Sequence, residues 1–232
     1  MAEPALILLP GLGADRRLFT PQLDRFETAS VPDWIERHPG DTLGSFAQRL
    51  AGTLDLERPH VLAGFSFGGM VALEIASRVP EARRPLSVVL LSGLRSRRAV
   101  TRTFKLQQAI GGLVPRPVVR AALRGPVTRA FAKREGLSEE QTATLRAMAA
   151  ETDLDFLFWA ARACARWDHD GVCPAPVRHL HGESDRIIPC VPHPELPGGE
   201  PELIEGAGHL ITWTAADRVN GALARALAES AA

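Results

Sequence analysis

The stretch HVLAGFSFGG at residues 60–69 decides how the chain folds. Its first six residues form a mostly apolar run, as in a strand that is buried on both faces. The residues that follow, MVALEIASR at 70–78, have a helical pattern. Between the two lies a Gly-x-Ser-x-Gly pattern centred on Ser66. We therefore expect a serine in a tight turn between a strand and a helix.

The two glycines around Ser66 favour a chemical role for this serine over an ordinary Gly-Ser turn. Such a turn holds the serine in a strained backbone conformation, in which neighbouring side chains would collide. Gly64 and Gly68 remove those side chains. The turn would also place the Ser66 hydroxyl at the N-terminus of the following helix, where developing negative charge is stabilised. We expect Ser66 to be a nucleophile.

A serine nucleophile needs an adjacent base that works near neutral pH, and His209 is the best candidate among seven histidines. It follows a short apolar stretch that ends at Ile204 and precedes the last helical pattern. A loop at the edge of the sheet could therefore carry it to Ser66. His181 is the main rival, but it directly precedes Gly182 at the end of a strand, which favours a structural role.

The base in turn needs a buried carboxylate that fixes its protonated ring nitrogen. The segment HGESDRIIP at 181–189 offers Glu183 and Asp185. We favour Asp185, because it falls in the turn after the strand rather than at the tip of the strand. Asp168 and Asp170 lie elsewhere and are expected to be solvated.

The negative charge that forms on the reacting carbonyl oxygen requires two backbone N–H donors. One is expected from Phe67, the residue after the nucleophile. The other is expected from the glycine loop LPGLG at 9–13, which follows the first apolar run. Leu12 is the candidate donor within it. A Pro-Gly turn is common, so the evidence for this loop is its position after a strand.

Short apolar runs alternate with helical patterns along much of the chain, which is typical of βαβ units and a parallel sheet. Amphipathic helical patterns lie at 43–54 and 219–227. The fold class is therefore α/β, with helices on both faces of the sheet. The apolar runs are Ala5–Leu9, His60–Phe65, Leu86–Leu91 and Val177–Leu180.

Strand signals stop at 94–173, and this part of the chain is rich in Arg and Ala with helix-start signals at Ser138 and Thr152. We expect a core domain at 1–93 and 174–232 and a helical insertion at 94–173. Aromatic and alanine residues recur at helical spacing over 156–167. They indicate either core packing within the insertion or the roof of a substrate pocket.

Length and composition bound the class of protein. The 232 residues are 45% hydrophobic, and 27 basic residues balance 27 acidic ones, so neither nucleic acid nor an anionic membrane is an expected partner. Three irregularly spaced cysteines suggest neither a disulfide framework nor a zinc site and favour a reducing compartment. The first apolar run is too short to span a membrane. We expect a cytoplasmic protein that acts on a small molecule.

These residues together resemble the α/β-hydrolase superfamily, in which nucleophile, acid and base follow the order of Ser66, Asp185 and His209. Further stretches, PGLGAD at 10–15, PDW at 32–34 and ESDR at 183–186, resemble a group of small bacterial hydrolases of unassigned substrate. The resemblance implies the fold and a catalytic triad but no particular ester. It also implies that the helical insertion is a lid over the active site.

The chain departs from the family pattern in two ways. Many relatives begin the oxyanion loop with His-Gly, whereas this chain has Pro10–Gly11. The chain also begins at what would be the third strand of the family, so a sheet of about six strands, all parallel, is expected. The insertion has 14 basic and 8 acidic residues over 94–172. It resembles the lids of esterases that act on acyl groups carried by acyl carrier protein. An ordinary solvated Arg-rich surface explains the same surplus of basic residues.

The sequence thus predicts hydrolysis of a carboxylic ester or thioester through an acyl-enzyme, with no metal or cofactor. The same fold and triad could instead serve carbon–carbon bond hydrolysis, lyase chemistry or cofactor-free peroxidation. A binding module that keeps the pocket without catalysis is a third reading. Labelling by a serine-directed fluorophosphonate would separate the third reading from the others, and substrate profiling would separate the first two.

Overall fold

A single parallel sheet of six strands forms the centre of the computed structural model, which describes residues 3–101 and 114–229. The strand order is β2-β1-β3-β4-β5-β6, and every neighbouring pair is parallel. The expected α/β-hydrolase fold with about six parallel strands is thereby confirmed. The strands are β1 (Ala5–Leu9), β2 (Ala29–Ser30), β3 (His60–Phe65), β4 (Ser87–Leu91), β5 (Val177–Gly182) and β6 (Glu202–Ile204).

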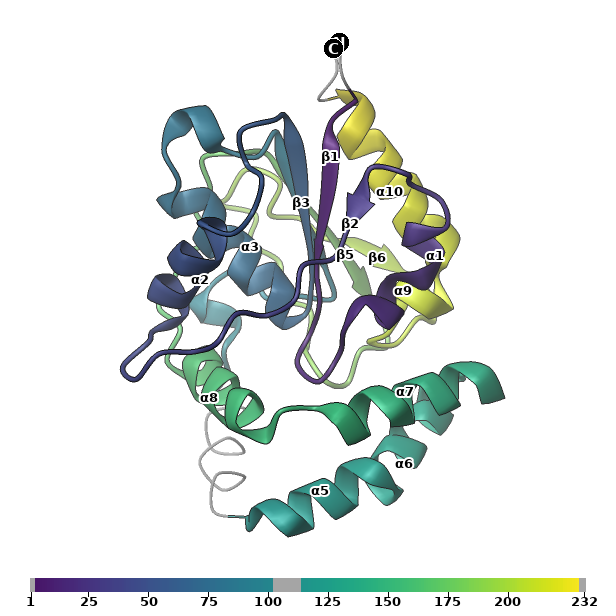
Figure 1. The fold of residues 1–232 in the computed structure, drawn as a ribbon. Helices are drawn as coiled ribbons and strands as arrows, with labels where there is room; N and C mark the ends of the chain where they lie inside the picture. Colours follow the sequence, from purple (N-terminus) through teal and green to yellow (C-terminus); the bar gives the residue numbers. More distant parts are fainter. Residues whose placement is uncertain (1–2, 102–113, 230–232) are drawn as a thin grey trace.

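The central strands are buried along their whole length because helices cover both faces of the sheet. Every residue of β1, β3 and β4 is buried, as expected for a parallel sheet between two helical layers. On one face lie α2 (Leu43–Ala51) and α3 (Phe67–Arg78), and on the other lie α1 (Thr20–Leu23), α9 (Ile211–Thr214) and α10 (Ala216–Glu229) (Figure 1). Each face has its own apolar core.

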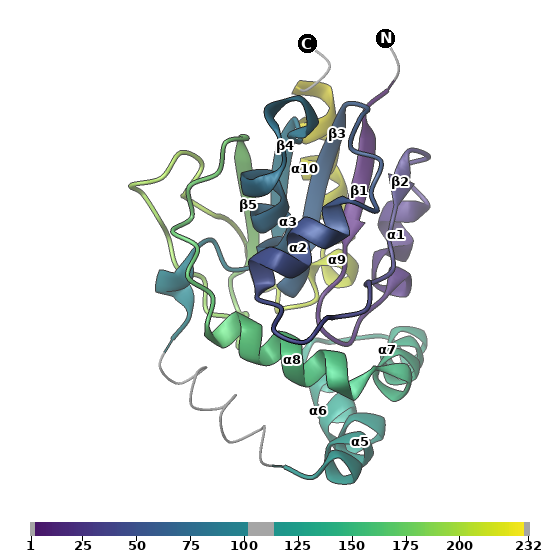
Figure 2. The same ribbon diagram turned by 60° about the vertical axis from the view of Figure 1, so that its left-hand side comes forward.

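The chain between β4 and β5 forms a helical segment at the end of the sheet where the strands finish. Its helices lie across that end, and α8 lies next to α2 (Figures 1 and 2). We call residues 94–173 the β4–β5 segment; residues 102–113 of it, with Arg102 and Lys105, lie outside the described residues. The described helices are α5 (Arg116–Arg124), α6 (Pro126–Arg134), α7 (Glu139–Glu151) and α8 (Leu154–Ala165).

Side-chain caps set the starts of the two longer helices in this segment. Ser138 accepts from the backbone N–H of Gln141, and Gln141 accepts from that of Ser138, which makes a capping box at the start of α7. The helix start expected at Thr152 is one residue later, because the Asp153 side chain caps α8. Only Thr152 and Asp153 therefore separate α7 from α8.

The aromatic face of α8 packs on the apolar core that covers one face of the sheet, not within the insertion itself. Phe156 and Trp159 lie against Phe46 of α2, with ring centroids 5.7 and 4.8 Å from the Phe46 ring. Trp167 donates through Nε1 to the buried Glu74 carboxylate of α3 at 2.7 Å. These contacts anchor the end of the β4–β5 segment to the sheet domain.

Within the two described ranges, none of the helices is long and apolar enough to cross a membrane.

Candidate active site

Ser66 occupies the turn between β3 and α3 in a backbone conformation that residues with side chains rarely adopt. Its φ is 53° and its ψ is −114°, so the residue is strained. Its N–H donates to the Leu91 carbonyl oxygen at 2.8 Å, which ties the turn to β4. The strand, turn and helix therefore present the serine at the end of the sheet.

The turn is possible because two glycines let backbone segments meet. A Cβ atom on Gly64 would lie 2.2 Å from the Gly68 carbonyl oxygen, and one on Gly68 would lie 2.1 Å from the Leu9 carbonyl oxygen. Neither distance is sterically allowed for a carbon atom. The second contact also fixes the start of α3 against the end of β1, where the expected oxyanion loop begins.

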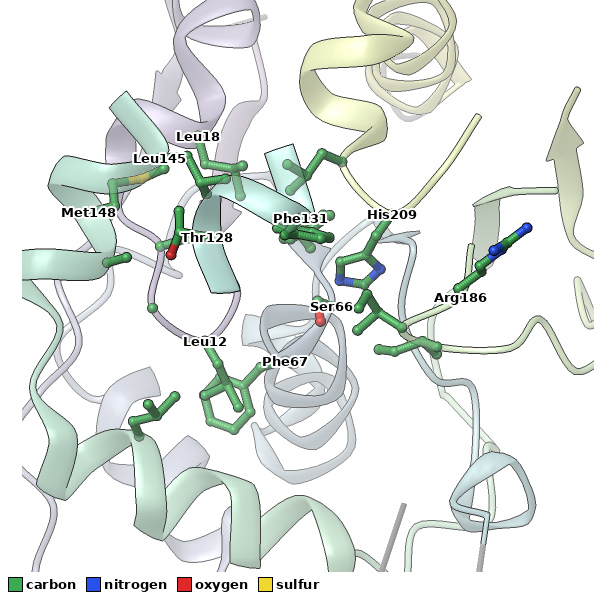
Figure 3. Close-up of a pocket in the computed structure, with 18 of the residues that line it drawn as sticks. Leu12, Leu18, Ser66, Phe67, Thr128, Phe131, Leu145, Met148, Arg186 and His209 are labelled. Atoms are coloured by element: carbon green, nitrogen blue, oxygen red, sulfur yellow. The ribbon is translucent and has the colours of Figure 1, made fainter. Parts of the chain in front are cut away.

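His209 lies on the loop between β6 and α9 and faces the same cavity as Ser66 (Figure 3). Its ring packs against Phe65, the residue before Ser66, with ring centroids 4.9 Å apart. Its Nδ1 donates to Asp185 Oδ2 at 2.6 Å. This bond orients the opposite ring nitrogen, Nε2, away from the carboxylate and leaves it available as a base.

Asp185 is held from both sides by hydrogen-bond donors. Its side chain is only 1% exposed, and its Oδ1 accepts from the backbone N–H groups of Ile187 and Ile188 at 2.8 and 3.0 Å. Burial alone would raise the pKa of Asp185, but hydrogen bonds from His181 and His209 outweigh it and hold that pKa well below its usual range. The group is therefore a carboxylate at neutral pH.

His181 contacts the same Asp185 carboxylate. The sequence indicated a structural role for His181 but not this contact. Its Nε2 lies 3.3 Å from Asp185 Oδ2 and donates to the Ile188 carbonyl oxygen at 2.9 Å. Burial lowers the pKa of His181, yet the bonds to Asp185 and Cys190 raise it overall to about 10. The buried His181 ring is therefore an imidazolium next to the Asp185 carboxylate.

His179 completes this buried row by sharing a hydrogen bond with His181, 3.1 Å between Nε2 of His179 and Nδ1 of His181. Burial, followed by the charge on His181, lowers the pKa of His179 to about 3. Only one of the two rings is therefore charged. In the sequence, the sign of this pair was the H-x-H pattern at the end of β5. Side chains alternate along a strand, so residues 179 and 181 share one face. Alternation does not show what role either ring has.

The alternative carboxylates have other partners. Glu183 accepts from the backbone N–H of Gly206 at 3.2 Å and so braces the loop that leads to His209. Asp168 and Asp170 are exposed, as expected. Of the carboxylates weighed from the sequence, Asp185 is the one that bonds His209.

The two expected oxyanion donors both border the cavity beside Ser66. Phe67 is the first residue of α3, so its N–H is one of those that a helix leaves unpaired at its N-terminus. Leu12 lies on the loop after β1, and Figure 3 shows it next to Phe67 below the serine. The segments that follow β1 and β3 therefore meet beside Ser66.

A mostly apolar cavity of about 920 Å³ surrounds these groups, within the size range of small-molecule sites. The sheet and its helices form its floor, and α5, α6, α7 and α8 form its roof. Figure 3 shows roof and floor side chains converging around Ser66 and His209. Sequence reasoning did not identify the roof residues, which include Phe131, Leu145, Met148, Ala149, Leu157 and Cys164.

A serine in an elbow after β3, an acid after β5 and a histidine after β6, on a parallel sheet with a helical segment across its end, define a class of protein. A family profile described as the alpha/beta hydrolase family matches residues 6–222. The chain belongs to this family.

Relatives within this class differ in what they are described as doing. The chain is 28% identical over 225 residues to the dihydrolipoyllysine-residue acetyltransferase component of the acetoin cleaving system of Pseudomonas putida. The match covers 91% of this chain and 56% of that protein. The chain thus spans little more than half the length of this curated relative.

Solved structures share the fold at low identity. A thermophilic esterase from Thermogutta terrifontis, with malate bound, has a TM-score of 0.75 at 22% identity, over 98% of this chain and 90% of that one. MenH from S. aureus has a TM-score of 0.70 at 17% identity, over 100% of this chain and 96% of that one. The chain therefore belongs to the alpha/beta hydrolase family, and these neighbours share its fold.

Proposed function

We propose that the protein is a serine hydrolase that cleaves a carboxylic ester or thioester through an acyl-enzyme. The observation that carries the proposal is the 2.6 Å hydrogen bond from His209 to the buried Asp185, beside a serine in a strained elbow. A structural serine does not require this strain. An imidazole fixed by a buried carboxylate, on the same cavity as a serine hydroxyl, is the arrangement that makes a serine reactive.

In the first half of the reaction, the Ser66 Oγ attacks the substrate carbonyl carbon while Nε2 of His209 accepts the hydroxyl proton. The carbonyl electron pair moves to oxygen, and the N–H groups of Leu12 and Phe67 stabilise that oxyanion. When the pair returns, the bond to the alcohol or thiol breaks. The leaving group takes the proton from His209, and the acyl group stays on Ser66.

In the second half, water replaces the alcohol or thiol. His209 accepts a proton from water, the hydroxide attacks the acyl carbonyl carbon, and the second tetrahedral intermediate uses the same two donors. Its collapse releases the carboxylic acid and returns the proton to Ser66. Asp185 remains a carboxylate throughout and stabilises the imidazolium in each half. The scheme uses no metal or cofactor.

The cavity supports a substrate with an apolar acyl group. Its walls are mainly aliphatic and aromatic, with Phe131 and Leu145 on the roof side and Ile188 near His209. Burial of each methylene group of an acyl chain contributes about 0.8 kcal/mol. We further propose that the β4–β5 segment, residues 94–173, acts as a lid, because α5, α6, α7 and α8 all line this cavity.

Replacement of the nucleophile is the direct test. Ser66→Ala should lower kcat on short p-nitrophenyl esters by at least about 10³-fold. A matched control is Ser77→Ala, because Ser77 lies exposed on α3, the helix that follows Ser66. A fluorophosphonate probe should label the wild type and the control but not Ser66→Ala. Near-normal turnover by Ser66→Ala would overturn the proposal.

A panel of esters and thioesters of graded chain length then defines the reaction within this proposal. Turnover should also fall by at least about 10²-fold in His209→Ala, which lacks the general base. Near-normal turnover by this variant would remove His209 as the base. Labelling by the probe without turnover of any ester or thioester would favour another chemistry of the same triad.

The basic surface of the β4–β5 segment supports one extension, a substrate attached to an acidic carrier protein. Arg124, Arg129 and Lys133 are exposed on α5 and α6, and the same two helices line the cavity through Leu123 and Phe131. An acidic carrier bound there would have the cavity within reach of its acyl group. This partner, like a cytoplasmic location, is part of the proposal.

Charge reversal tests the carrier. The double variant Arg129→Glu, Lys133→Glu should lower kcat/KM for an acyl carrier thioester by about tenfold or more and leave that for a small free thioester unchanged. Arg58→Glu, at the start of β3, is the control at the opposite end of the sheet. Equal effects of the double variant on both substrates would reject the carrier.

A further inference from the structure

We propose that Glu135 is a positioning residue through which the β4–β5 segment holds the loop of the catalytic base. This inference rests on the proposed function, because it concerns the placement of His209. Glu135 directly follows α6 and is 75 residues away from the loop it contacts. Neither the elbow motif nor the order of the triad points to it.

The Glu135 carboxylate is buried against the residues on both sides of His209. Its side chain is 3% exposed, and its Oε2 accepts from the backbone N–H of Leu210 at 3.0 Å. On the other side, a Cβ atom on Gly208 would lie 2.4 Å from the same oxygen. Gly208 therefore leaves the space that the carboxylate fills.

The bond to Leu210 serves as a helix cap that comes from a distant segment. Leu210 is the N-cap residue of α9, which has no side-chain cap of its own. A carboxylate at this position satisfies a backbone donor at the start of the helix. The result is a fixed start of α9, and His209 is the residue just before that start.

The charges around the carboxylate do not explain its burial as an ion pair. Arg134 Nε is 3.6 Å from Glu135 Oε1, and the Arg134 side chain is 40% exposed. A pair this far apart, with its guanidinium partly in water, contributes little. The loop has one other carboxylate, Glu205, which is exposed. A buried carboxylate is costly, so its placement against the base loop is better explained by what it fixes there.

The same segment therefore roofs the cavity and fixes the base. Phe131, one turn before Glu135, lines the cavity above Ser66 and His209 (Figure 3). When α6 packs in this position, the side chains of Phe131 and Glu135 are both placed. The base is then held in its working position when the roof over the substrate is in place.

Substitutions at Glu135 separate this role from simple anchoring. Glu135→Gln keeps an acceptor oxygen for the Leu210 N–H, whereas Glu135→Ala removes it. A small displacement of a catalytic group lowers the rate by about 10²-fold. We expect Glu135→Ala to lower kcat on a short p-nitrophenyl ester by about 10- to 100-fold with KM changed less than threefold, and Glu135→Gln to keep kcat within about threefold of wild type.

A third variant reaches the same contact from the opposite side. Gly208→Ala leaves Glu135 in the chain but places a methyl group where the carboxylate lies, so it should reproduce the loss of kcat. Glu139→Ala is the matched control, since Glu139 is exposed in the first turn of α7. Its kcat and KM should equal those of the wild type.

Hydrogen exchange of the Leu210 amide measures the bond without any substrate. The amide should be protected in the wild type and in Glu135→Gln, and it should exchange faster in Glu135→Ala. This measurement, made on folded protein as judged by circular dichroism, decides the case if the alanine variant is too unstable for kinetics. Glu135→Gln then supplies the kinetic comparison on its own.

The outcomes divide cleanly. The inference is overturned if Glu135→Ala keeps kcat within threefold of wild type, if only KM changes, if Glu135→Gln loses as much kcat as Glu135→Ala, or if the Leu210 amide exchanges equally in all variants. Failure of the proposed function looks different, because wild type and Ser66→Ala would then turn over the ester equally.

Discussion

His209 Nδ1 and Asp185 Oδ2 lie 2.6 Å apart and join the loops that follow β6 and β5. With 1% of the Asp185 side chain and 7% of the His209 side chain exposed, water does not compete effectively for this bond. The carboxylate therefore selects the ring tautomer in which Nδ1 is protonated. The basicity of the opposite nitrogen depends on this selection.

Asp185→Asn should remove that selection while nearly preserving the shape of the side chain. We expect kcat on a p-nitrophenyl ester to fall by about 10³- to 10⁴-fold, because an amide can donate to Nδ1 and stabilise the wrong tautomer. Steady-state kinetics with saturating ester measure the effect. The exposed Asp168 gives the control Asp168→Asn. A loss of less than tenfold in Asp185→Asn would show that the carboxylate does not orient the base.

The imidazolium of His181 predicts a pH dependence of stability. The pKa of His181 is raised from an ordinary 6.5 to about 10 in the folded chain, so proton binding favours folding. This contribution is complete below about pH 6.5 and is lost as the pH rises through about 10. His181→Gln should therefore destabilise the protein by about 1–3 kcal/mol near pH 6 and by less near pH 10.

Urea unfolding of the wild type and His181→Gln at several pH values measures this difference. His38→Gln is a matched control, because His38 is exposed, and its effect on stability should be small and should not follow the same course. The idea fails if the difference between wild type and His181→Gln is constant from pH 6 to pH 10, or grows toward pH 10. Either result would mean that His181 is neutral in the folded protein.

Local chemistry in the sequence predicted the parts of the site that depend on neighbouring residues. Gly64 and Gly68 specify the elbow around Ser66, and the apolar runs specify the strands that bring the loops of Asp185 and His209 to one edge. These features follow from backbone sterics and periodicity, which are readable along the chain. The triad roles remain predictions that the proposed experiments test.

Contacts between distant segments explain what the sequence did not reveal. The strand β2 is only the two residues Ala29–Ser30, too short for a periodic pattern. The roof of the cavity depends on how α6 and α7 pack on the core, and Glu135 meets Leu210 across 75 residues. No local pattern records such pairs, because side-chain packing in three dimensions selects them.

The close approach of Gly68 to β1 makes this glycine a test of the elbow. A Cβ atom there would lie 2.1 Å from the Leu9 carbonyl oxygen, and backbone cannot move away as a flexible side chain can. We expect Gly68→Ala to destabilise the protein by about 1–3 kcal/mol or more and to lower kcat, since Ser66 shifts with the turn. Chemical denaturation and ester turnover measure the two effects.

Gly221→Ala is the counterpart in an ordinary helix. Gly221 lies in α10, and the nearest atom to a Cβ there is the end of the Arg225 side chain at 3.6 Å. This change should stabilise the protein by about 0.5–1 kcal/mol through helix propensity, with no effect on turnover. If Gly68→Ala behaved like Gly221→Ala, the turn would not be as tight as the elbow requires.

Ala149 tests whether the roof of the cavity selects the substrate. It lies on α7, is nearly buried and lines the cavity beside Met148. Ala149→Leu adds apolar volume to the wall, so acyl chains long enough to reach α7 should lose space. A change of one methylene in an apolar pocket is worth about 1–3 kcal/mol. We expect kcat/KM for long-chain esters to fall by about tenfold or more relative to that for acetyl esters.

The ratio of the two kcat/KM values separates specificity from general damage, because a misfolded or displaced roof lowers both. Ala121→Leu is the control, since Ala121 is exposed on α5 and should leave the ratio unchanged. An equal loss for acetyl and long-chain esters in Ala149→Leu would mean that acyl chains do not reach α7. A selective loss would assign chain-length selection to the β4–β5 segment, while the bond-breaking groups stay on the strand ends of the sheet domain.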